Sequence, residues 1–138
     1  MAVGILVDTN VLLDVFTEDP VWFEWSSTAL AEAAEAGPLW INPLIYAEVS
    51  VRFSHIEDIE DALATGEFHR AQLPWEAAFL AGKAFLQYRR SGGTKTSTLA
   101  DFYIGAHSAV ADLALLTRDG RRYRTYFPTV SLIAPSPA

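Results

Sequence analysis

A run of apolar residues near the start of the chain, ended abruptly by an acid, limits most strongly what this sequence can fold into. The segment from Val3 to Val7 carries no polar side chain. Such a run is typical of a strand that is buried on both faces, as in a parallel sheet. The acid that ends it, Asp8, would stand at the carboxyl end of that strand, where open parallel sheets bind their ligands.

Strand-like and helical segments alternate along the rest of the chain, which favours an α/β fold with a central parallel β-sheet flanked by helices on both faces. The 138 residues suit a single domain, residues 1–138, with 133–138 as a loose tail. The further strands are expected at 39–41, 113–116 and 130–133, with an extended segment at 68–73. The helices are expected at 9–17, 22–36, 43–53, 56–65, 75–90 and 99–111.

Composition and charge exclude some classes of functional site and make others less favourable. The absence of cysteine excludes disulfides, thiol nucleophiles and cysteine-ligated zinc. No apolar stretch approaches the roughly 20 residues of a membrane span, and the start lacks the basic region of a signal peptide, so we expect a cytoplasmic protein. The net charge of −7 argues mildly against nucleic-acid binding. All Lys and Arg residues except Arg52 and Arg70 nevertheless lie in residues 83–138, where they could follow a phosphate backbone or simply balance the acidic part.

Four acids stand among apolar neighbours, where an ionised carboxylate is costly unless it is paired, hydrogen-bonded or metal-bound. Asp8 and Asp119 follow the two best-defined strands, and Glu48 and Asp101 lie on helices between them. Each acid also has a structural interpretation as a helix cap, an exposed ion-pair partner or part of a turn. In those interpretations Asp8 caps the helix after it, Glu48 pairs with Arg52, Asp101 forms a capping box with Thr98, and Asp119 forms a turn with Gly120.

If the four acids meet, their mutual repulsion makes a cation necessary, and their hard oxygen atoms suit Mg²⁺ or Mn²⁺. Such ions promote phosphodiester hydrolysis. Other catalytic patterns are missing, because no histidine pair has metal-ligand spacing and no nucleophile elbow or glycine-rich phosphate loop is present. An aromatic cluster formed by Trp22, Phe23 and Trp25 could pack in the core or bind a partner.

Four segments carry the acids in order: Val7–Asp14, Ile41–Glu48, Leu99–His107 and Leu115–Asp119. As an ordered set they resemble the motifs of the PIN domain, and single-domain chains of this size and pattern resemble VapC toxins. The resemblance implies that the four acids converge to hold one or two Mg²⁺ or Mn²⁺ ions. It also places Asn10 and Thr117 at accessory polar positions of that site.

The same resemblance implies an endoribonuclease that cleaves RNA by metal-activated water, is silenced by a VapB-like antitoxin and pairs as a homodimer. Lys95, Arg118 and Arg121 are the candidate RNA contacts. Two alternatives stay open at this point. One is a haloacid-dehalogenase-like phosphatase with Asp8 as nucleophile, although Asn10 stands where that class has a second aspartate. The other is a non-catalytic α/β binding domain in which the acids are caps and ion-pair partners.

Overall fold

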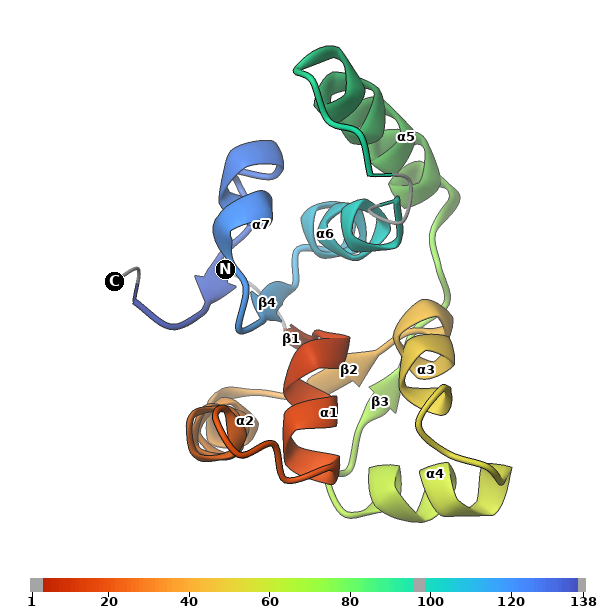
Figure 1. Cartoon of the computed structure of the whole chain (residues 1–138), viewed down its shortest axis with the longest axis vertical. Coiled ribbons are helices and arrows are strands. Elements are labelled where there is room, and N and C mark those ends of the chain that lie inside the picture. Colours follow the sequence, from red (N-terminus) through yellow and green to blue (C-terminus); the bar gives the residue numbers. More distant parts are fainter. Residues whose placement is uncertain (1–3, 96–98, 137–138) are drawn as a thin grey trace.

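The computed structural model describes residues 4–95 and 99–136 and has a parallel sheet between two groups of helices (Figure 1). The five strands run in the order β3-β2-β1-β4-β5, and every neighbouring pair is parallel. This confirms the predicted α/β fold. The strands are β1 (Ile5–Val7), β2 (Leu39–Ile41), β3 (His69–Arg70), β4 (Ala114–Leu116) and β5 (Leu132–Ile133). The helices are α1 (Thr9–Phe16), α2 (Phe23–Ala36), α3 (Pro43–Ser50), α4 (Ile56–Ala64), α5 (Trp75–Arg90), α6 (Leu99–Ala111) and α7 (Arg121–Tyr126).

The strand β1 is central, which explains its uninterrupted apolar sequence. Leu6 lies opposite Trp40 of β2 on one side and Leu115 of β4 on the other. Both Leu6 and Leu115 are fully buried, because helices cover both faces. Figure 1 shows α5 and α6 together on one side of the sheet and α1 and α2 on the other. The predicted first strand is therefore confirmed, although Val3 lies outside the described residues.

The helices agree with the sequence prediction in type and differ at some ends. The bounds of α5 and α6 are those predicted. The helix α3 ends at Ser50 and not at Phe53, because the next residues continue as turns with bonds such as Phe53 N–H to the Ser50 carbonyl. The short helix Arg121–Tyr126 was not predicted, since its six residues, with three arginines, show no apolar period.

The end of the chain adds the edge strand β5. Leu132 lies opposite Leu115, and Ile133 opposite Leu116, so the first residue of the predicted tail belongs to the sheet. Residues 134–136 form neither helix nor strand, and 137–138 lie outside the described part. Within residues 4–95 and 99–136, no helix is long and apolar enough to cross a membrane.

Candidate active site

Asp8 lies at the carboxyl end of β1 with only 4% of its surface exposed. Its Oδ1 accepts a hydrogen bond from the backbone N–H of Thr9 (2.8 Å), so Asp8 does cap α1. Its Oδ2 accepts from the hydroxyls of Thr117 (2.9 Å) and Tyr123 (3.1 Å). Burial, with an added contribution from the charge of Asp101, raises the pKa of Asp8 to about 6 against the lowering effect of its hydrogen bonds.

Thr117 connects the ends of β1 and β4. Its buried hydroxyl donates to Asp8 and accepts from the Asn10 side-chain amide (3.3 Å) and the backbone N–H of Asp119 (3.1 Å). Asn10 also accepts from the backbone N–H of Arg118 (3.2 Å). These contacts are possible because β1 and β4 are parallel neighbours and end at the same edge of the sheet. The two residues predicted as accessory positions, Asn10 and Thr117, thus lie beside Asp8.

Glu48 of α3 is half-buried and faces α1. Its Oε1 accepts a hydrogen bond of 2.7 Å from the hydroxyl of Thr9. Burial raises the pKa of Glu48, and the charge of Asp101 adds to this increase. The described residues contain no ion pair between Glu48 and Arg52, so the alternative of an exposed helix pair is not supported.

Asp101 lies in the first turn of α6 and pairs with Arg122 of α7. The Arg122 Nη1 lies 2.8 Å from the Asp101 Oδ2. Burial raises the pKa of Asp101, Arg122 lowers it, and the charge of Asp119 raises it. Asp119 itself is exposed, directly after Thr117 and Arg118. The predicted capping box cannot be judged, because Thr98 lies outside the described residues.

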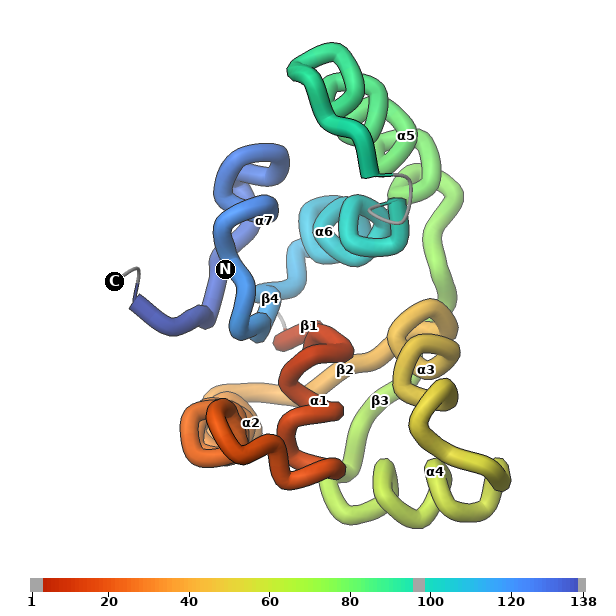
Figure 2. Tube along the Cα trace, viewed as in Figure 1, coloured from red at the N-terminus to blue at the C-terminus, as the bar shows by residue number. Residues whose placement is uncertain are grey.

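Three of the four predicted acids line one cavity of about 290 Å³. Figure 2 shows α1, α3 and α6, which carry or adjoin these acids, grouped around the end of β1. Asp119 is not part of this lining, although its charge acts on Asp101. Within residues 4–95 and 99–136, no three His, Asp or Glu side chains form a group that could hold a metal ion as placed. The cavity is lined by Asp8, Thr9, Asn10, Leu13, Asp14, Thr17, Asp19, Glu48, Arg52, Asp101 and Arg118.

The three candidate RNA contacts have different surroundings. Arg118 lines the cavity, where its Nε lies 2.8 Å from the Oδ2 of buried Asp14 and its guanidinium lies 5.4 Å from the Trp22 ring centroid. Arg121 is exposed at the start of α7. Lys95 is exposed too, and its backbone N–H donates to the Tyr88 hydroxyl (3.3 Å).

Four residues near the acids were missed by sequence reasoning. Thr9 bonds to both Asp8 and Glu48, Tyr123 bonds to Asp8, and Arg122 bonds to Asp101. Asp14 holds Arg118. The sequence did give a reason to consider Asp14, because it stands between apolar residues in the first motif. In the structure this residue is buried, with 2% of its surface exposed. The residues of α7 offered none, since the helix itself was not predicted.

The predicted aromatic cluster has mixed surroundings. Trp25 packs against the hydrophobic core, and its ring meets that of Trp22 edge-on at 6.1 Å. Trp22 in turn carries the Arg118 guanidinium on its face. Core packing therefore accounts for Trp25, and Trp22 supports a residue of the cavity.

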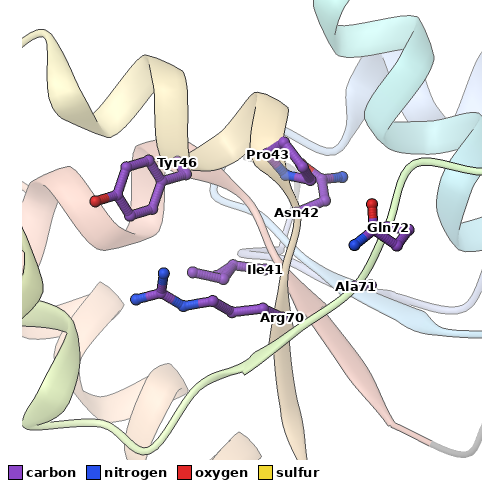
Figure 3. Close-up of a pocket in the computed structure, with 7 residues that line it drawn as sticks. All are labelled: Ile41, Asn42, Pro43, Tyr46, Arg70, Ala71 and Gln72. Atoms are coloured by element: carbon purple, nitrogen blue, oxygen red, sulfur yellow. The ribbon is translucent and has the colours of Figure 1, made fainter.

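A second cavity of about 300 Å³ lies beside α3 and the end of β3 (Figure 3). The charged residue that lines this cavity, Arg70, already has partners. Its Nη2 lies 2.7 Å from the Glu60 Oε1, and its guanidinium lies 5.3 Å from the centroid of the Tyr46 ring. The Asn42 amide is also engaged, with the Ile45 N–H (2.8 Å) and with His107 Nδ1 (2.9 Å). No carboxylate of the predicted site lines it, so we treat it as separate. It is lined by Ile41, Asn42, Pro43, Tyr46, Arg70, Ala71 and Gln72.

Comparison with known proteins identifies the family. The sequence matches the PIN domain over residues 5–128. This chain belongs to the PIN domain family. The resemblance seen in the sequence is therefore confirmed, and the match includes all four acids. No curated protein matches this PIN domain.

Solved structures with a similar fold include ones described as VapBC2, FitAcB and a toxin–antitoxin complex. VapBC2 from Rickettsia felis bound to a promoter DNA fragment has a TM-score of 0.71 at 15% identity, covering 94% of this PIN domain and 97% of that chain. A toxin–antitoxin complex from Klebsiella pneumoniae has a TM-score of 0.67 at 23% identity, with 98% and 100% covered. FitAcB from Neisseria gonorrhoeae has a TM-score of 0.68 at 18% identity, with 94% and 96% covered. At these identities the likeness is one of fold.

Proposed function

We propose that this PIN domain is a Mg²⁺- or Mn²⁺-dependent endoribonuclease and the toxin of a VapBC-type toxin–antitoxin pair. The observation that carries the proposal is the cavity shared by Asp8, Glu48 and Asp101. The pKa of each of these carboxyls is raised, first by burial and then by a neighbouring acid. Like charges brought together in this way are unfavourable without a cation, so the arrangement calls for one.

The donor groups suit a hard divalent ion in their chemistry, since carboxylate oxygens are the ligands that Mg²⁺ and Mn²⁺ prefer. Asp8, Glu48 and Asp101 would hold the first ion, and Asp119 would contribute to it or to a second. When bound, such an ion supplies activation of water and stabilisation of the leaving oxygen in phosphodiester hydrolysis.

The protein's own residues orient the acids. Three hydrogen bonds, from Thr9, Thr117 and Tyr123, fix both oxygens of Asp8. The Thr9 hydroxyl also orients Glu48, so one residue positions two acids. Asn10, which binds Thr117 and the Arg118 N–H, stands where the phosphatase class has a second aspartate. This argues against the phosphatase alternative.

The comparisons support the proposal of a protein partner, whereas RNA and the homodimer are proposed from the resemblance to VapC toxins. The similar solved structures are described as VapBC, FitAcB and toxin–antitoxin complexes, and nearly the whole of this chain aligns with them. We therefore propose an antitoxin of the VapB kind as the protein partner, RNA as the substrate and a homodimer as the assembly. This proposal is stronger than that of a non-catalytic binding domain, because caps and ion pairs alone do not explain three acids in one cavity.

The test combines metal binding with RNA cleavage. Mn²⁺ titrated calorimetrically into metal-free protein should bind the wild-type chain, and RNA 5′ ends should appear only with Mg²⁺ or Mn²⁺. Asp101→Ala should abolish cleavage while the circular dichroism spectrum persists. Asp61→Asn, an exposed acid outside the cavity, is the matched control and should leave cleavage intact. Absence of Mn²⁺ binding in the wild type, or full activity of folded Asp101→Ala, would reject the proposal.

A further inference from the structure

The ion pair between Arg122 and Asp101 suggests a second role for α7, and this inference rests on the nuclease function proposed above. We propose that Arg122 neutralises Asp101 in the metal-free protein and contacts an RNA phosphate once a divalent cation has taken its place. Arg122 would then be a substrate-binding residue of the same site.

The pair engages a carboxylate that the proposed cation would also need. The Arg122 Nη1 lies 2.8 Å from the Asp101 Oδ2, in side chains that are 28% and 41% exposed. Asp101 is also the acid whose charge acts on both Asp8 and Glu48. The guanidinium offsets the charge of the one acid that acts on the other two, and a divalent ion bound by Asp101 would compete with it.

The Arg122 guanidinium has a second support that does not depend on Asp101. It lies 5.7 Å from the ring centroids of both Tyr88 and Phe102. These rings contact each other edge-on at 5.5 Å. Arginine binds aromatic faces through cation–π and stacking interactions. If the ion pair opens, the rings keep the charge beside the cavity, where a phosphate could accept its planar donor groups.

Arg118, which lines the cavity and has a carboxylate partner of its own, is held differently. Its partner Asp14 is 3% exposed at the side chain and also accepts from the Ser26 hydroxyl (2.7 Å). Releasing Arg118 would leave a buried charge without its cation, which is strongly unfavourable. When Arg122 is released, the incoming metal ion would neutralise Asp101 in its place. Of these two paired arginines, Arg122 is thus the one that ligand binding can free.

The first measurement is metal affinity, with Arg122→Gln compared with Arg70→Gln. Arg70 is a matched control, because it also forms an arginine–carboxylate pair (2.7 Å to Glu60) but lies outside the carboxylate cavity. In metal-free protein titrated with Mn²⁺, Arg122→Gln should bind more tightly, on the order of fivefold, since a competing charge is removed. Arg70→Gln should bind Mn²⁺ as the wild type does.

The second measurement is RNA affinity in Ca²⁺, with a single-stranded oligonucleotide whose integrity is checked on a gel. Arg122→Gln should bind this RNA more weakly, and the slope of log K against log salt should fall by about 0.7, the value for one phosphate contact. Arg70→Gln should leave both quantities unchanged. Tighter metal binding together with weaker RNA binding is the expected signature, whereas a merely structural role would weaken both.

The outcomes separate the two proposals. If the wild-type chain binds neither Mn²⁺ nor RNA, the nuclease function fails. If the wild type binds both, an Arg122→Gln variant with unchanged or weaker Mn²⁺ affinity overturns the role of Arg122 alone. Unchanged RNA affinity and salt slope in that variant overturn it as well.

Discussion

Replacement of Asp8 by asparagine should stabilise the metal-free protein at neutral pH, although it removes a proposed metal ligand. Burial raises the pKa of Asp8 from 3.8 to about 6, a shift of roughly two units. At about 1.4 kcal/mol per unit, the ionised carboxylate then lowers the free energy of unfolding by about 3 kcal/mol. Because Asp8 is 4% exposed, little of this effect is lost to solvent screening.

The direction of the pH effect on stability follows from the protons that Asp8 binds in the folded and unfolded states. Between pH 3.8 and about 6, the folded state holds the Asp8 proton and the unfolded state does not. The contribution of Asp8 to stability therefore falls as the pH rises through this window and stays low above it. Asparagine carries no charge, its oxygen can accept from the Thr9 N–H, and its amide can donate to the Tyr123 hydroxyl.

The assay is urea denaturation of wild type and Asp8→Asn in EDTA at pH values from 4 to 8. The difference in unfolding free energy, variant minus wild type, should rise by about 2 kcal/mol between pH 4 and pH 7. Burial lowers the pKa of His107, which has the opposite pH effect, but this contribution is common to both proteins and cancels. Excess Mn²⁺ should stabilise the wild type more than the variant. A difference that stays constant with pH would refute the reasoning.

Three further substitutions test the packing around the site by urea denaturation. Tyr123→Phe removes a hydroxyl that donates to the buried carboxylate after β1, and should cost about 1–3 kcal/mol at pH 8 and less at pH 4; equal costs would contradict this. Asp14→Ala leaves Arg118 without its carboxylate and should cost about 2–4 kcal/mol, so a neutral result would count against the pair. Gly105→Ala puts a methyl carbon 2.5 Å from the Phe127 ring and should cost about 1–3 kcal/mol, whereas unchanged stability would mean that the ring moves freely.

The sheet could be predicted because its central strands are buried on both faces. The runs ending at Val7 and Leu116 are apolar, and each is followed within three residues by an acid of the proposed site. The same reasoning placed Asp8 and Asp119 at one edge of the sheet. The local sequence pattern was enough here, because a strand that is buried on both faces consists of consecutive apolar residues.

The contacts that orient the acids could not be predicted in this way. Thr9 and Glu48 are 39 positions apart in sequence, and Asp8 and Tyr123 are 115 apart. No local spacing encodes such pairs, because they depend on how α3 and α7 pack against the sheet. The helix α7 was missed for a related reason, since its place is fixed by the burial of Tyr123 and of Phe127 after it and not by an apolar period.

The two hydroxyls that bind Asp8 both come from late in the chain. During synthesis on the ribosome, a nascent polypeptide that has reached residue 110 already contains three of the four acids, yet it has neither Thr117 nor Tyr123 to orient the first of them. It also lacks β4, the strand that β1 pairs with on one side. The proposed site therefore stays incomplete until both hydroxyls have been synthesised and β4 has paired with β1, so a shorter nascent polypeptide cannot hold Asp8 in the orientation seen here.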